Sequence, residues 1–150
     1  MPQVEHTTHI YAPAHLVFGF IANQPERQSE WWKPIELQQR ITPAPTQVGS
    51  IARYVYNMMG VRLKGEHEVI ALREDEYLKV KTLSGIDSTF EFFFKSVKEG
   101  TQLTIRVNYK LPGALVGQLL NRIAIEQKNE ADLRAGLENL KKLIEAPVGV

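Results

Sequence analysis

The residue best suited to chemistry is His67, one of four histidines in the 150-residue chain. It lies in the segment 61–72, where Val61, Leu63 and Val69 alternate with charged residues in a pattern that predicts a strand. This alternation places His67 on the inner face of the expected sheet. A histidine in that position can act as a general acid or base near neutral pH, or hydrogen-bond a ligand. The alternative is a structural histidine bonded to a polar neighbour.

Two carboxylates, Glu126 and Glu130, lie one turn apart on a long helix predicted over 112–145. They interrupt its apolar stripe, which is formed by Val116, Leu119, Ile123, Leu133, Leu137, Leu140 and Ile144. Buried carboxylates are unfavourable unless they are paired or hydrated. One hypothesis is therefore that a glutamate lines an internal cavity and forms its polar spot together with His67. The alternative is that rotation of the helix places a glutamate at the rim, where Glu130 pairs with Arg134.

Aromatic side chains supply the remaining candidates for ligand binding. Tyr54 and Tyr56 share one face of the strand predicted over 50–59, and their hydroxyls could orient a ligand if this face points inward. Both faces of that strand contain apolar residues, so the pattern leaves its orientation open. Further wall or core residues are expected at Trp32, Phe90, Phe92 and Tyr109.

Several kinds of chemistry lack support in the sequence. The absence of cysteine excludes thiolate nucleophiles and thiolate metal sites, and no histidine spacing typical of a metal site occurs. Neither a phosphate-binding loop nor a dinucleotide fingerprint is present, so we expect no metal and no cofactor. The net charge of +1 argues against nucleic-acid binding. With no apolar run of about 18–20 residues and no signal peptide, we expect a cytoplasmic protein without integral membrane association.

The elements that position these residues follow a simple order. The pattern predicts a strand over 3–11, two short helices over 13–23 and 25–30, six further strands between 34 and 111, and the long helix. Short turns between the six strands indicate an antiparallel meander. The long helix is the element able to cover its apolar face. The sequence therefore predicts one α+β domain over 1–150, with about seven curved antiparallel strands around a C-terminal helix.

This pattern resembles the START-like, helix-grip superfamily of birch-pollen-type allergens (SRPBCC), in its polyketide cyclase/dehydratase-like branch. The resemblance covers almost the whole chain and is carried by IYAPAHLVFGFIAN, the Trp31-Trp32 pair, Val48-Gly49, GEHEV, Glu99-Gly100-Thr101 and LENLKKLIE. It implies a deep cavity between sheet and helix that takes apolar or amphipathic small molecules. It transfers no catalytic motif, because the branch has no shared one.

Three functions are compatible with these features. The first is binding or transport of a hydrophobic or amphipathic small molecule, such as a lipid, an isoprenoid or an aromatic polyketide. The second is a cyclase or dehydratase in which His67 or a glutamate moves a proton. The third is a co-chaperone-like interaction protein. The sequence shows no complete catalytic constellation, which favours the first, and it leaves a homodimer open.

Overall fold

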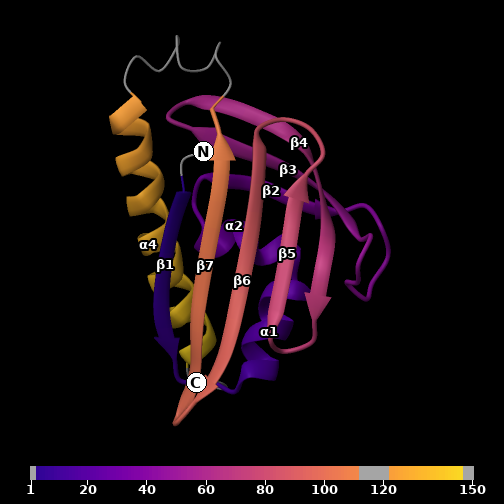
Figure 1. Ribbon diagram of the computed structural model, residues 1–150, viewed down its shortest axis with the longest axis vertical. Coiled ribbons are helices and arrows are strands. Elements are labelled where there is room, and N and C mark those ends of the chain that lie inside the picture. The colour runs from indigo at the N-terminus through magenta and orange to yellow at the C-terminus, as the bar shows by residue number, and fades with distance from the viewer. Residues whose placement is uncertain (1–2, 112–121, 147–150) are drawn as a thin grey trace.

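A single curved sheet of seven antiparallel strands dominates the fold, as Figure 1 shows. The computed structural model describes residues 3–111 and 122–146. Spatial order across the sheet is β1-β7-β6-β5-β4-β3-β2, so consecutive strands from β2 to β7 are neighbours and β1 joins the edge beside β7. The strands are β1 (Gln3–Ile10), β2 (Ile35–Arg40), β3 (Ile51–Met58), β4 (Val61–Arg73), β5 (Tyr77–Thr82), β6 (Asp87–Val97) and β7 (Gly100–Lys110).

Two register shifts help to bend the sheet. One lies in β2 between Ile35 and Leu37, and the other lies in β4 between Val69 and Ala71. An extra residue in one strand increases its local twist and bend. The shift in β4 also ends the alternation expected from the sequence, because Leu72 packs against the core beyond Val69. Before the shift, from Val61 to Val69, the inward positions are those that the sequence pattern predicted.

The helices cover the concave face of the sheet, which lies behind the strands in Figure 1. Pro13 precedes α1 (Ala14–Ala22), and the short η1 (Pro25–Arg27) and α2 (Gln28–Trp31) follow before the chain enters β2. The long α4 (Arg122–Glu145) packs along β1 and against α2. None of the helices in the described part of the chain has the length and apolar character needed to span a bilayer.

The C-terminal end of α4 is fastened to the end of β1 by polar contacts. The Lys141 ammonium donates to the His9 carbonyl (2.6 Å) and to the Glu145 carboxylate (2.7 Å). The same carboxylate accepts a hydrogen bond from the backbone N–H of Tyr11 at 2.8 Å. These contacts hold the helix along the sheet edge and thereby position its middle turns over the concave face.

The apolar stripe of α4 differs from the predicted one in its first half. Leu133, Leu137 and Leu140 are fully buried, as expected, but Ile123 is 65% exposed. Ile125 and Asn129 occupy the buried positions instead. The predicted stripe residues Val116 and Leu119 lie outside the described residues. The helix is therefore rotated about its own axis relative to the predicted orientation, so that a different set of side chains faces the sheet. The fold class predicted from the sequence is confirmed.

Candidate functional site

A cavity of about 100 Å³ lies between the concave face of the sheet and the helices. This volume is well above the space that one water molecule needs. Most of the lining is apolar and comes from β3 to β7, with further residues from α2, β2 and α4. Seven of the nine residues singled out in the sequence line it, namely Trp32, Tyr54, Tyr56, His67, Phe90, Phe92 and Tyr109.

The other two, Glu126 and Glu130, do not line the cavity, so the hypothesis of a cavity glutamate is wrong and the alternative stated for Glu130 is confirmed. Both are exposed, and Glu130 instead accepts a hydrogen bond from Arg134 at 3.0 Å on the outer face of α4. The physical reason is the rotation of the helix. Turning Asn129 inward buries a neutral amide, which is less unfavourable to desolvate than a carboxylate.

The structure resolves the orientation of β3, which the sequence left open. Tyr54 and Tyr56 both point into the concave side. The Tyr54 hydroxyl donates to the Ser84 carbonyl at 2.7 Å, and the Tyr56 hydroxyl contacts Asn129 Oδ1 at 3.3 Å. Burial raises the pKa of both phenols, so both are protonated at neutral pH.

A row of inward residues crosses the sheet at one level of the cavity. Strand registers pair Arg40 with Ala52, Ala52 with His67, and His67 with Thr82. Thr82 and Ser88 are joined by two hydrogen bonds, at 2.8 and 3.1 Å. Ser88 in turn pairs with Tyr109. We call Arg40, Ala52, His67, Thr82, Ser88 and Tyr109 the polar row.

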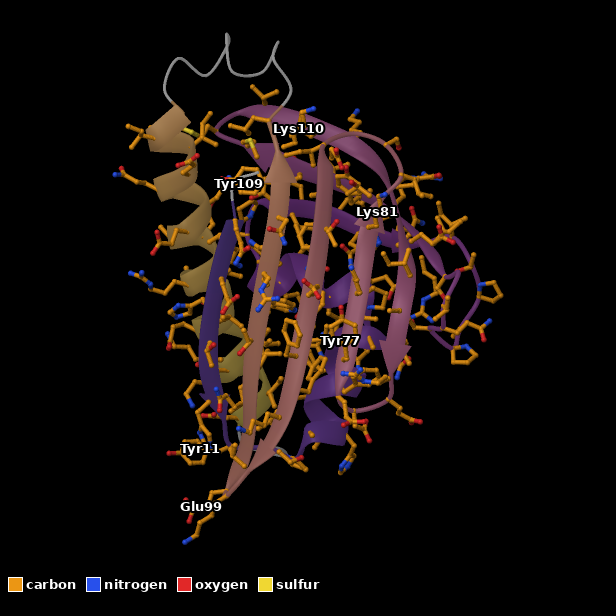
Figure 2. All side chains as sticks on the ribbon, in the orientation of Figure 1. Tyr11, Tyr77, Lys81, Glu99, Tyr109 and Lys110 are labelled. Carbon is orange, nitrogen blue, oxygen red and sulfur yellow. The ribbon has the colours of Figure 1, made fainter. Side chains whose placement is uncertain are left out.

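The polar row crosses β5 and β7 toward one end of these strands. In Figure 2, Tyr109 and Lys81, which precedes Thr82, lie in the half of the sheet away from Tyr11 and Glu99. One of the two adjoining inward rows consists of apolar residues from five strands. These residues are Val4, Val69, Val80, Phe90 and Val107. The cavity is therefore amphipathic, with a polar level beside an apolar one.

Three buried polar atoms at the cavity have no hydrogen-bond partner. They are Trp32 Nε1, His67 Nδ1 and Ser88 Oγ, and they are the only such side-chain atoms in the described part of the chain. All three residues line the cavity. Most buried polar groups in proteins are paired, and leaving one unpaired costs about 1–3 kcal/mol. The three atoms therefore place unsatisfied hydrogen-bonding capacity at one cavity.

Residues 1–145 match the sequence profile of the family described as polyketide cyclase / dehydrase and lipid transport. The chain belongs to this family. A search of curated protein sequences finds no significant match. The resemblance inferred from the sequence is thus confirmed at the level of the family.

Solved structures with the same fold come from diverse organisms. A protein of Thermus thermophilus superposes with a TM-score of 0.80 at 19% identity, covering 97% of this chain and 98% of that chain. The Zhui aromatase/cyclase of a Streptomyces species gives 0.71 at 20% identity, with 99% and 98% covered. Major latex-like protein 151 of Panax ginseng gives 0.68 at 13% identity, with 94% and 95% covered. At these identities the likeness establishes the helix-grip fold alone.

Membership of the polyketide cyclase / dehydrase and lipid transport family supports hydrophobic-ligand binding or cyclase-like activity in general terms. The electrostatics of His67 bear on the choice between them. Burial lowers the pKa of His67 from 6.5 to about 4, because desolvation disfavours its charged form. Its ring stacks near that of Tyr54, with centroids 5.9 Å apart. At neutral pH it is therefore an uncharged imidazole.

This lowered pKa predicts a pH dependence of stability. Because the folded state holds His67 neutral while the unfolded chain takes up a proton below pH 6.5, stability should fall as the pH drops from 6.5 toward 4. Relative to His67→Leu, the wild-type protein should lose about 2 kcal/mol of unfolding free energy between about pH 7 and about pH 4.5. Urea unfolding of both proteins at the two pH values measures this. An equal loss in both would contradict burial of a neutral His67.

Ser88, Asn129 and Thr82 are among the polar lining residues that were not candidates from the sequence. Ser88 precedes Phe90 and Phe92 in the same alternation, so the pattern that turned the phenylalanines inward also turned Ser88 inward. Asn129 stands four residues before Leu133, which is one helical turn along the buried stripe. Thr82 stands two residues after Val80, so strand alternation turns it to the same face, but its hydrogen bonds to Ser88 depend on the strand register.

Proposed function

We propose that the protein binds a small amphipathic molecule in this cavity, as a carrier or a sequestering protein. The observation that carries the proposal is the set of three unpartnered polar atoms, on Trp32, His67 and Ser88, at an otherwise apolar cavity. A ligand with a polar end would satisfy them. Its apolar body would lie against the adjoining row around Val80 and Phe90.

The energetics of such a ligand follow from the two levels of the cavity. Each 100 Å² of apolar ligand surface that leaves water contributes about 2.5 kcal/mol. Burial of apolar surface therefore supplies most of the affinity, but it does little to fix the orientation of the ligand. Hydrogen bonds to the polar row fix the orientation, because reversing the ligand would leave both its polar end and the row unpaired.

A second candidate is a cyclase-type enzyme in which neutral His67 accepts a proton from a bound substrate. The unpartnered Nδ1 atom at the cavity favours it. Two features weigh against it. An efficient general base has a pKa near the working pH, and that of His67 is about 4. Among the described lining residues there is also no carboxylate to raise it.

Filling the apolar level should abolish binding of a neutral fluorescent probe such as 1-aminoanthracene. Val80 is buried in the cavity wall, whereas Lys81 beside it is exposed. We expect Val80→Phe to weaken probe binding at least tenfold, which is about 1.4 kcal/mol. Lys81→Phe adds the same ring to the same strand on the outer face and should leave binding unchanged. Fluorescence titration measures both, with circular dichroism confirming the fold.

A second filling variant protects this test against a folding defect. Ala52 lies in the polar row and is also buried, so Ala52→Leu should narrow the cavity from another strand. Unchanged probe affinity in both folded filling variants would contradict the proposed site. Native mass spectrometry of the purified protein then separates the two candidates. A carrier releases the bound molecule unaltered, whereas an enzyme converts it at a rate that His67→Ala reduces.

A further inference from the structure

Apart from Arg40, the polar groups of the described lining residues are uncharged. His67 is a neutral imidazole and the buried phenols are protonated, as their shifted pKa values require. The other polar lining residues from the sheet interior and α4 are neutral by nature, namely Gln38, Thr82, Ser88 and Asn129. No lysine, aspartate or glutamate is found among the described lining residues.

Among the described lining residues Arg40 is the one exception, and its guanidinium already has polar partners. Its Nη2 donates to the Asn23 carbonyl at 2.9 Å, and its Nε lies 3.6 Å from Glu26 Oε1. Both partners belong to the α1–η1 corner and draw the guanidinium toward it. An anion in the cavity would have to compete with these contacts.

The nearest negative charge adds repulsion. Asp132 on α4 lies close enough to Tyr56 to help raise its pKa. Its carboxylate, on a mostly buried side chain, pairs with the exposed ammonium of Lys128. A carboxylate ligand placed beside Tyr56 and Asn129 would thus meet a like charge, and the described lining residues offer it no cation other than Arg40. Burying a charge without a counter-charge is far less favourable than burying a hydrogen-bonded hydroxyl or carbonyl.

The unpartnered atoms specify the hydrogen-bonding groups of the ligand. Trp32 Nε1 is a donor only, so it requires an acceptor on the ligand. Ser88 Oγ can donate or accept, and a neutral imidazole offers one nitrogen of each kind. A hydroxyl group can satisfy any of the three, and a carbonyl oxygen can accept from Trp32 Nε1 or Ser88 Oγ. A pure hydrocarbon leaves all three unpaired.

We propose that the cavity selects electrically neutral ligands that carry a hydroxyl or carbonyl group over carboxylates of the same size and shape. The proposal rests on the proposed binding function and specifies its ligand class. Fatty acids and other anionic amphiphiles are then poor ligands, and alcohols, phenols and ketones with a compact apolar body are good ones.

A matched set of bicyclic probes tests this selectivity. The probes are 2-naphthol, 2-naphthoate and 2-methylnaphthalene, measured at neutral pH by displacement of 1-aminoanthracene. We expect 2-naphthoate to bind at least about 100-fold more weakly than 2-naphthol, because its charge is desolvated without a partner. We expect 2-methylnaphthalene to bind about 5–10-fold more weakly than 2-naphthol, because it leaves the polar atoms unpaired.

Single substitutions identify the groups responsible. In at least one of Ser88→Ala and Trp32→Phe, the advantage of 2-naphthol over 2-methylnaphthalene should fall to near one, while 2-methylnaphthalene keeps its affinity. If neither variant reduces this advantage, the unpartnered atoms do not recognise the ligand and the proposal is overturned. The proposal also fails if 2-naphthoate binds as tightly as 2-naphthol and loses that affinity in Arg40→Gln, because Arg40 would then supply a counter-charge.

The same measurements distinguish failure of the selectivity from failure of the binding function. Equal affinity for all three probes, sensitive to Val80→Phe, would retain the cavity as a binding site and refute its preference for neutral ligands. Absence of binding by every probe, 1-aminoanthracene included, would refute the binding function itself.

Discussion

Replacing Trp31 by alanine should lower the free energy of unfolding by about 3–5 kcal/mol, which is typical of a buried tryptophan. Trp31 is 1% exposed and is the largest fully buried side chain among the described residues. Its backbone carbonyl accepts a hydrogen bond from Asn139 on α4 at 3.2 Å. It therefore joins α2 to the long helix at the centre of the core. Urea unfolding monitored by circular dichroism measures the loss.

The neighbouring tryptophan provides the comparison. Trp32 stacks on Trp31 with ring centroids 5.8 Å apart, but it faces the cavity and its Nε1 is unpartnered. Trp32→Phe keeps a ring and removes the unpaired donor, so it should cost about 1 kcal/mol or less. A loss below about 1 kcal/mol for Trp31→Ala would show that Trp31 is not the anchor of the helices.

Replacing Gly65 by alanine should destabilise the protein by about 1–3 kcal/mol, as overpacking does. Gly65 pairs with Tyr54 across β3 and β4. A Cβ atom at this position would lie far inside contact distance of the Ser84 carbonyl oxygen and 2.9 Å from the Tyr54 hydroxyl. The added methyl group would thus press on the bond that holds the turn before β6 to β3. Thermal unfolding, together with urea unfolding, measures the effect.

The same substitution at Gly19 should change the free energy of unfolding in the opposite direction. Gly19 lies inside α1, and a Cβ there would meet no atom within 4 Å. Gly19→Ala should therefore stabilise the protein by about 0.5–1 kcal/mol, because alanine loses less backbone freedom on forming a helix. If Gly65→Ala did not lower the free energy of unfolding, the result would contradict the close contact between β4 and the Ser84 turn.

Most of the fold followed from local patterns in the sequence. Alternation and short turns predicted the meander, and the residues expected as wall or core at Phe90, Phe92 and Tyr109 line the cavity. These predictions succeeded because a strand exposes successive side chains on opposite faces, so one buried residue determines the orientation of the others. On β3, where both faces carry apolar residues, the same rule left two answers open.

The candidate site was predictable only where one pattern dominated. His67 and the aromatic residues of β6 were placed correctly at the cavity. Glu126 and Glu130 were not, because two helical stripes fit the sequence about equally well upstream of Leu133. One continues through Glu130 and Glu126, and the other through Asn129 and Ile125. Packing of α4 against β1 and α2 selects the second.

The sequence by itself therefore determined the order of the elements, the helix-grip fold and the presence of His67 on an inner face. Tertiary structure alone decided which polar groups meet. His67, Thr82 and Ser88 come from three strands, and strand register brings them into one row. Trp32 joins them from the end of α2. Register and helix rotation are set by long-range packing, which local spacing does not record, and they leave three unpaired atoms around one cavity.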